Sequence, residues 1–304
     1  MKVIFFGSGA FGLPALGAIQ TSSHALLGVV TNPDKAQGRS QQLQPTPVKS
    51  WALQNKIPVL EFSAELRNVE ADVWVVISFG TLLSKTMLGI PKICALNVHA
   101  SLLPRYRGAS PIQSALLNGE RETGVSVIRL TEKLDAGDVL VQEKIPVSAS
   151  DYFMDLEKKL SDLSAGALIA GLRSIENKEA RFKAQEESRV VVCRRISKEE
   201  GCLDWNDSAE NIRNRIRAFQ KWPGTYSFYG GKRILLHQAD LGGILRPLNS
   251  RPGMILPSSS GAEIQVATQD RTLLIRRLQL EGRRVLSAEE FLKGFRLEAG
   301  KFFE

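Results

Sequence analysis

The chain has 304 residues, which is long enough for two domains that each bury a core. Its formal net charge is +8, and residues 206–304 alone hold 16 Lys and Arg against 10 Asp and Glu. This asymmetry favours an acidic partner such as nucleic acid, although a basic surface without any ligand has the same composition.

Composition argues against disulfide frameworks, metal clusters and membrane spans. The three cysteines are odd in number and show no C-x-x-C spacing, and the three histidines are scattered. No apolar run approaches a membrane-spanning length. The apolar start of the chain is short and breaks at Gly7, which predicts a first strand rather than a signal peptide. We therefore expect a cytoplasmic protein without a metal site.

The first strand, Lys2–Phe6, leads into Gly7-Ser-Gly-Ala-Phe-Gly12, which matches the dinucleotide fingerprint G-x-G-x-x-G and opens a helix through about Gln20. A dinucleotide site also needs an acidic residue at the end of the second strand. Here that strand, Ala25–Val30, ends in Thr-Asn-Pro. We interpret the glycines as a tight turn that allows close packing. The segment Pro33–Pro47 follows as a long polar loop, which is either functional or merely solvated.

Two later runs, 71–78 and 93–99, are apolar enough to be buried strands. Alternation along the second run places Asn97 and His99 on one face. Open α/β sheets bind ligands at the carboxyl ends of such strands. A neighbouring amide and imidazole can polarise a carbonyl and accept a proton. The alternative is a turn-forming asparagine beside a buried core histidine.

Strands and helices alternate up to about residue 188, which predicts a doubly wound, Rossmann-like, largely parallel sheet. Residues 189–205 are charged and mixed and are interpreted as a linker. Residues 206–304 begin with an amphipathic helix, and short β-type runs then predict a small barrel of the oligonucleotide-binding type. The five runs are Thr225–Tyr229, Arg233–His237, Met254–Leu256, Ala262–Ala267 and Thr272–Leu280. The expected domains are thus 1–188 and 206–304.

Three spaced motifs, Asn97–Gln113, Glu122–Ser126 and Leu134–Asp138, occur in one order over about forty residues. Together they resemble the folate-dependent formyltransferases, and most closely the members that act on methionyl-tRNA. The resemblance continues in segments on both sides, so that it spans nearly the whole chain. These segments are 31–49, 197–201, 204–205 and 217–219.

The resemblance implies transfer of a formyl group from 10-formyltetrahydrofolate to the methionine α-amine of initiator methionyl-tRNA, by a monomer without a metal. It places Arg39, in the polar loop, at the tRNA acceptor end. The chain departs from the family pattern at Gln41 and Gln42, where lysines are common, and at 192–195. The implied site residues are Asn97, His99 and Asp135 for catalysis and Ser101, Leu102, Leu103 and Pro104 for folate binding.

The implied roles agree with the chemistry of acyl transfer, which needs donors for a developing oxyanion and an acceptor for the amine proton. Asn97 would donate to the formyl oxygen, His99 would stabilise that oxygen or take the proton, and Asp135 would orient His99. No covalent intermediate is expected. Three alternatives remain: a formyltransferase acting on glycinamide ribotide, one acting on a nucleotide amino sugar, and a non-catalytic nucleic-acid-binding protein.

Overall fold

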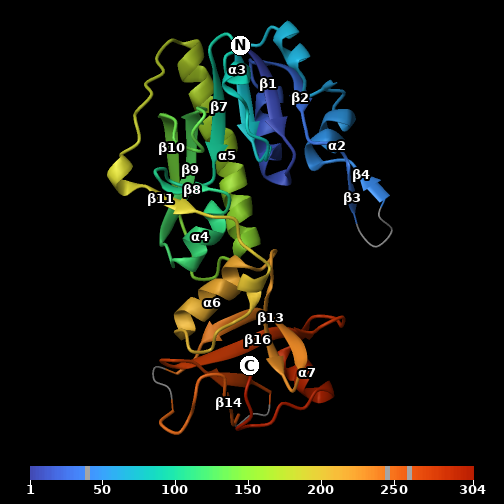
Figure 1. Ribbon diagram of the computed structural model, residues 1–304, viewed down its shortest axis with the longest axis vertical. Helices are drawn as coiled ribbons and strands as arrows, with labels where there is room; N and C mark the ends of the chain where they lie inside the picture. Colours follow the sequence, from blue (N-terminus) through green and yellow to red (C-terminus); the bar gives the residue numbers. More distant parts are fainter. Residues whose placement is uncertain (38–41, 244–246, 259–261) are drawn as a thin grey trace. The chain divides into compact units, whose positions relative to one another are not determined.

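The computed structural model describes residues 1–37, 42–243, 247–258 and 262–304 (Figure 1). The chain forms two compact units, each interrupted in sequence. The first unit comprises Met1–Pro111, Glu122–Val147 and Leu156–Cys193, and the second comprises Ile112–Arg121, Ser148–Asp155 and Arg194–Glu304. Within the described part of the chain, none of the helices has the length and apolar character needed to cross a membrane.

The first unit contains a seven-stranded sheet with the order β10-β9-β7-β6-β1-β2-β5. Its strands are β1 (Lys2–Gly7), β2 (Ala25–Val30), β5 (Val59–Leu60), β6 (Val73–Ile77), β7 (Cys94–His99), β9 (Glu122–Arg129) and β10 (Val139–Pro146). The first five of these run parallel, whereas β9 is antiparallel to both of its neighbours. The expected Rossmann-like, largely parallel sheet is therefore confirmed, with an antiparallel hairpin at one edge.

The parallel strands are apolar because side chains cover both faces of the sheet. All five residues of β6 are buried. On one face, Phe6, Trp74 and Phe79 belong to one buried cluster, which also includes Ala95 of β7. Alternation along β7 then places Asn97 and His99 on the same face as Ala95. The helices of this unit are α1 (Leu13–Gln20), α2 (Pro47–Gln54), α3 (Lys85–Leu88) and most of α5 (Phe153–Glu176).

The glycines after β1 serve packing, as the sequence indicates. A Cβ on Gly7 would lie 2.7 Å from Ile77 O, and a Cβ on Gly12 would lie 2.9 Å from Phe5 Cζ. The one hydroxyl of the turn is used within the protein, since Ser8 Oγ lies 3.3 Å from Thr31 Oγ1 and accepts from Asn32 N at 3.0 Å.

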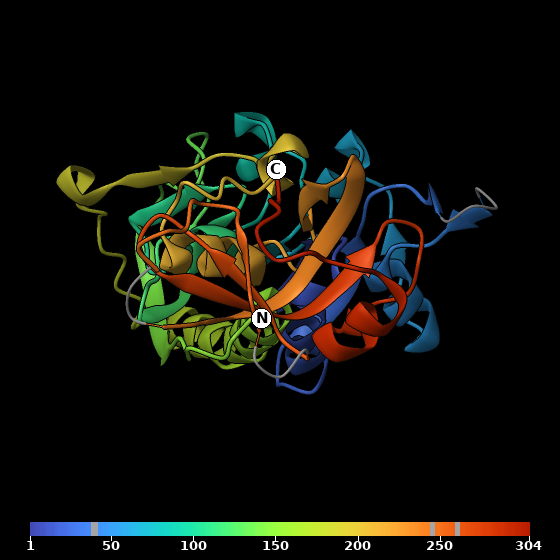
Figure 2. The ribbon, with the colours of Figure 1, turned by 90° about the horizontal axis from the view of Figure 1, so that it is seen from below.

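The polar segment 33–47 differs from the loop expected, because it contains a short antiparallel hairpin. Strands β3 (Lys35–Gln37) and β4 (Gln42–Gln44) project from the body of the unit (Figures 1 and 2). The base of the hairpin is fixed by an ion pair, in which Lys49 Nζ lies 2.8 Å from Asp34 Oδ1. Arg39, the residue expected at the acceptor end, lies outside the described residues.

The second unit is built on a curled antiparallel sheet with the order β12-β13-β16-β15-β14, in which β17 also pairs with β16 (Figure 2). Its strands are β12 (Thr225–Tyr229), β13 (Lys232–Leu241), β14 (Ile255–Leu256), β15 (Ile264–Ala267), β16 (Thr272–Leu280) and β17 (Leu286–Ser287). Its helices are α6 (Ala209–Ala218), α7 (Ala288–Gly294) and nearly all of α4 (Pro111–Leu117). All five expected strands are present, whereas β17 and α7 were not predicted.

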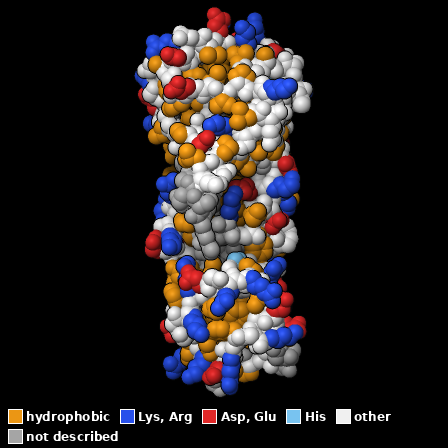
Figure 3. All heavy atoms as spheres, turned by 90° about the vertical axis from the view of Figure 1, so that its right-hand side faces the viewer, with side chains coloured by type: hydrophobic (Ala, Val, Ile, Leu, Met, Phe, Trp, Pro, Cys, Tyr) orange, Lys and Arg blue, Asp and Glu red, His pale blue; other side chains and the backbone are white. Residues whose placement is uncertain are grey.

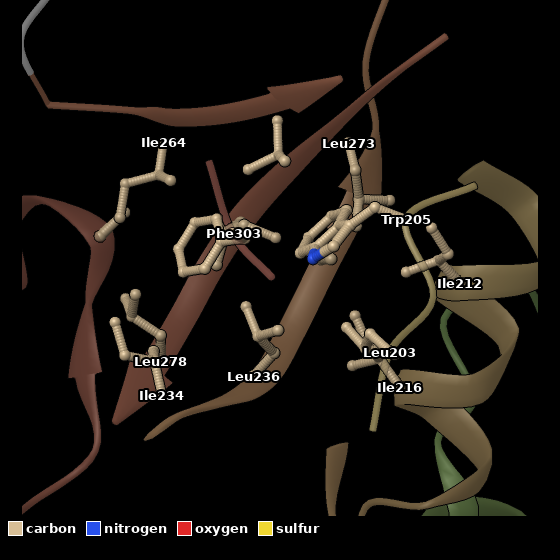
Figure 4. Packing of buried hydrophobic residues seen from close by; sticks show 14 of the residues in the cluster. Leu203, Trp205, Ile212, Ile216, Ile234, Leu236, Ile264, Leu273, Leu278 and Phe303 are labelled. Atoms are coloured by element: carbon tan, nitrogen blue, oxygen red, sulfur yellow. The ribbon is translucent and has the colours of Figure 1, made fainter. Parts of the chain in front are cut away.

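The last residues of the chain close this curled sheet, because they bond to both of its edge strands. Glu304 exchanges backbone hydrogen bonds of 3.0 and 2.8 Å with Phe228 of β12, and Ile255 N of β14 donates to Lys301 O at 2.8 Å. The core beneath contains Trp205 stacked on Phe303, with ring centroids 5.6 Å apart (Figure 4). Trp205, which the sequence places in a linker, is thus a core residue of the second unit.

Candidate active site

The three residues expected to be catalytic lie together in the first unit. Asn97 Nδ2 donates to Asp135 Oδ1 at 3.2 Å, and His99 Nδ1 lies 3.5 Å from Asp135 Oδ2. Asn97 and His99 share one face of β7, whereas Asp135 comes from the loop between β9 and β10. That loop runs back over β7, which explains how an aspartate 38 residues away reaches Asn97.

A polar group of the protein faces each ring nitrogen of His99. Its Nε2 lies 2.8 Å from Tyr106 O, and because a carbonyl can only accept, Nε2 carries the proton and donates. Nδ1 then faces the carboxylate of Asp135, and both side chains are only 7% exposed. A proton taken up at Nδ1 would therefore meet a carboxylate, and the resulting imidazolium would have an acceptor at each N–H.

Asn97 is the most accessible of the three, since it is partly exposed while His99 and Asp135 are buried. Its amide has two N–H groups, and one of them satisfies Asp135. The second N–H can donate to an external oxygen. An amide fixed in this way by a neighbouring carboxylate is a preorganised donor for an oxyanion.

Asp135 adopts a left-handed backbone conformation with φ of 50°. Such a conformation costs of order 1–3 kcal/mol for a residue other than glycine, so the surrounding structure must hold it. Gly108 N donates to Asp135 Oδ2 at 2.9 Å, and Gln185 Nε2 donates to Asp135 O at 2.8 Å. Gly137 completes the turn, because a Cβ there would collide with Arg129 O.

A parallel two-stranded ribbon supplies part of this site. Strand β8 (Arg105–Gly108) pairs with β11 (Val191–Cys193). The ribbon corrects the sequence analysis, which places the second of these segments in a linker. The ribbon brings two strands together closely, since a Cβ on Gly108 would collide with Cys193 O. From it come the Tyr106 carbonyl that binds His99 and the Gly108 amide that binds Asp135.

The loop expected to bind folate follows β7 directly. Ser101 and Leu103 are buried, and Leu102 and Pro104 are partly exposed. Two residues that sequence reasoning did not assign hold this loop. Ser126 Oγ accepts from Leu103 N at 3.1 Å and donates to Ser101 O at 2.7 Å. Gln142 Nε2 of β10 donates to Leu103 O at 2.9 Å.

Sequence reasoning also missed Gln185 and the environment of Arg107. Arg107 is buried, and its Nε donates to Gln185 Oε1 at 3.0 Å. Its Nη2 lies 2.8 Å from Glu187 Oε1, and this hydrogen bond lowers the pKa of the Glu187 carboxyl below its ordinary value. No local pattern marks Gln185, which lies in an irregular segment after α5.

Comparisons with known proteins find the same family over most of the chain. The family described as formyl transferase matches residues 1–172, and the formyl transferase C-terminal domain matches residues 195–296. A methionyl-tRNA formyltransferase from Legionella pneumophila is 39% identical over 300 residues, covering 96% of this chain and 95% of the relative. Another, from a Sulfurihydrogenibium species, is 36% identical over 313 residues and covers both chains fully.

Among solved structures, WlaRD, a sugar 3N-formyl transferase crystallised in the presence of dTDP and 5-N-formyl-THF, has a TM-score of 0.70. The identity is 18%, and the match covers 93% of this chain and 99% of that one. At this identity the likeness concerns the fold alone. The two family matches and the two curated relatives extend over nearly the whole sequence, and the chain belongs to the formyl transferase family.

Proposed function

We propose that this protein transfers the formyl group of 10-formyltetrahydrofolate to the α-amino group of methionine on initiator methionyl-tRNA. The observation that carries the proposal is the set formed by Asn97, His99 and Asp135, placed beside the Ser101–Pro104 loop. The names of the relatives from Legionella pneumophila and Sulfurihydrogenibium support the choice of methionyl-tRNA as the acceptor.

In this reaction a C–N bond forms to the methionine amine and the C–N bond to the folate breaks. Asn97 donates from its second N–H to the formyl oxygen while that oxygen gains negative charge. The pair of His99 and Asp135 takes up the proton that the amine loses, and the acceptors at both ring nitrogens stabilise the charged imidazole. The proton then returns to the departing nitrogen, so protons and electron pairs balance.

The folate fits the rigid loop after β7. Leu102 and Pro104 offer partly exposed apolar surface in the loop that follows β7, and the hydrogen bonds of Ser126 fix the backbone of the loop. Apolar surface combined with a few fixed polar groups is typical of small-molecule sites. The formyl donor supplies the activated one-carbon group, and no metal is needed for the steps assigned to these side chains.

The second unit supplies charge for binding the tRNA backbone. Figure 3 shows Lys and Arg side chains over its surface, intermixed with acidic ones. Within the described ranges, the exposed cations of this unit that have no ion pair with an acidic side chain include Lys232, Arg251, Arg277, Arg283, Arg284 and Lys301. Phosphate contacts from such residues give affinity that falls with salt and depends little on sequence.

The decisive experiment measures transfer of a radiolabelled formyl group to four acceptors in parallel. These are initiator methionyl-tRNA, elongator methionyl-tRNA, glycinamide ribotide and a nucleotide amino sugar. We expect efficient transfer to the initiator only. Equal rates on both tRNAs would favour a less specific amine formyltransferase, and transfer only to a small amine would overturn the tRNA assignment.

The proposed contributions of Arg39 and of the second unit to tRNA recognition are tested separately by two variants of the full chain. Replacing Arg39 with Ala should lower kcat/KM for methionyl-tRNA much more than it weakens tRNA binding, because a misplacement of about 1 Å can cost on the order of a hundredfold in rate. Replacing Arg283 and Arg284 with Gln should instead weaken binding and flatten its salt dependence. An Arg39→Ala variant with normal kinetics would exclude an acceptor-end role for this residue.

We further infer that the protein acts as a monomer in the cytoplasm, where charged tRNAs are used for translation. Sedimentation equilibrium across a range of protein concentrations tests the oligomeric state, and a constant mass near that of one chain is expected. A mass that rises with concentration would exclude the monomer. Fractionation of cells tests the location.

A further inference from the structure

Gln185 is the point at which three parts of the first unit meet. Its Nε2 donates to Asp135 O at 2.8 Å and to Gly137 O at 2.7 Å. Its Oε1 accepts from Arg107 Nε at 3.0 Å. Both N–H groups and the oxygen of this amide are therefore engaged, and none of its partners is adjacent in sequence.

The orientation of the Gln185 amide is determined by its partners. Two carbonyl oxygens face its nitrogen, and the guanidinium of Arg107 faces its oxygen, so that a flipped amide would place oxygen against oxygen. Arg107 is itself fixed, because it is buried and forms an ion pair with Glu187 at 2.8 Å. The amide is thus a rigid connection between β8 and the turn at 135–137.

The turn that Gln185 holds determines where the Asp135 carboxylate lies. Asp135 has φ of 50°, a conformation that is unfavourable unless neighbours impose it. From that backbone position, its Oδ1 accepts from Asn97 and its Oδ2 faces Nδ1 of His99 at 3.5 Å. If the turn relaxed, the carboxylate would lose both contacts together.

We propose that Gln185 is a positioning residue for formyl transfer, which acts by fixing the 135–137 turn so that Asp135 contacts Asn97 and His99 together. This inference rests on the proposed function of those three residues. Gln185 itself is only partly buried and contributes no apolar side chain to a core. Its loss should therefore affect the site more than the stability of the fold.

The first test observes the site without requiring activity. The chain has only three histidines, His24, His99 and His237, so their imidazole resonances can be assigned by single substitutions in a ¹⁵N NMR spectrum of the full protein. Gln185→Ala should move the His99 resonances and leave those of His24 and His237 unchanged. Gln54→Ala, at an exposed glutamine of α2, is the matched control and should move none of the three. Unmoved His99 resonances in Gln185→Ala would overturn the proposal.

The second test measures kinetics in two further variants of Gln185. Gln185→Met keeps the length of the side chain and removes the hydrogen bonds, and we expect kcat to fall about 10–100-fold while both KM values change less than about threefold. Gln185→Glu should be worse than Gln185→Met, because it directs carboxylate oxygens at the two carbonyls. A change confined to KM, or Gln185→Glu with normal kcat, would contradict the proposed role.

The third test asks whether Gln185 acts through Asp135. In an Asp135→Asn background, Gln185→Met should lower kcat by less than about twofold, because groups that act as a unit are not additive. The full effect in both backgrounds would show an independent structural role and overturn the inference. A wild-type protein that formylates nothing would instead contradict the proposed function, and the NMR test would remain valid.

Discussion

Two strand ends at the same edge of one sheet differ in what the chain places there. After β1, glycines let the turn pack against Phe5 and Ile77, and the only hydroxyl, that of Ser8, is used by Thr31 and Asn32. After β7, the strand itself ends in polar side chains. A loop and a ribbon then return over it and supply further polar partners.

The difference shows what a strand end needs in order to form a chemical site. Its polar side chains must lie on one face and must contact polar groups from distant segments of the chain. A glycine-rich turn has no such requirement, because its residues are selected by the space available to the backbone. The fingerprint after β1 is therefore an element of packing, whereas the asparagine and histidine of β7 form a chemical site. Four predictions test this comparison.

The largest effect is expected at the β7 end. Asp135→Asn should lower kcat at least about a hundredfold. The substitution removes the negative charge that faces His99 and disturbs the contacts of residue 135 with Asn97 and His99. The Kd for tRNA should hardly change. Asp138→Asn, three residues further along the same loop, is the control and should behave like the wild type. Normal turnover in Asp135→Asn would remove this residue from the mechanism and make Asp138 the next candidate.

At the β1 end we expect a change in stability rather than in turnover. Gly7→Ala should lower the free energy of unfolding by roughly 1–3 kcal/mol, because its Cβ would lie 2.7 Å from Ile77 O. Gly17→Ala in α1 is the control with the opposite sign. Among the described residues, no atom outside its chain neighbours and the backbone of its own helix lies within 4 Å of its Cβ, so it should stabilise the helix by about 0.5–1 kcal/mol. Urea titrations measure both, and a neutral Gly7→Ala would mean that the turn has room for a ligand.

A smaller effect is expected from the support of the loop that follows β7. Ser126→Ala removes the acceptor for Leu103 N and the donor for Ser101 O. The loss should be about 1 kcal/mol, seen as a roughly fivefold higher KM for the formyl donor. The control is Ser174→Ala in α5, whose hydroxyl donates to Gly171 O of its own helix. An unchanged KM in Ser126→Ala would separate this loop from the folate site.

The smallest effect concerns His24, which precedes β2 at the opposite edge of the sheet. Burial lowers its pKa below the ordinary value of 6.5, and the Glu176 carboxylate partly opposes this. The unfolded chain therefore binds the proton first as the pH falls. The contribution of His24 to stability is complete above about pH 6.5 and is lost as the pH falls below that value toward the lowered pKa.

Unfolding titrations at several pH values, for the wild type and for His24→Phe, test this expectation. Below pH 6.5, the free energy of unfolding of the variant should decrease less steeply than that of the wild type. Its turnover near neutral pH should match that of the wild type. Identical pH profiles of stability would show that His24 is not a source of the acid sensitivity.

The sequence alone determined the order of the elements and the face on which the key side chains lie. Apolar runs predict β1, β2 and β6, and the alternation of a strand places Asn97 and His99 together, since both are local properties of the backbone. The three motifs that resemble a known family are also visible in the sequence alone. The role expected for Asp135 came from that resemblance. The periodicity of strands and helices does not relate Asp135 to β7, because the two are far apart in the sequence.

Only the tertiary structure decided which distant groups complete each region. Gln185 reaches Asp135 across 50 residues, and Glu304 pairs with Phe228 to close the second unit. The segments that contribute β8 and β11 have too few residues and too mixed a composition to predict a ribbon by themselves. Contacts of this kind depend on how the whole chain closes upon itself, whereas periodicity reports only the immediate environment of each residue.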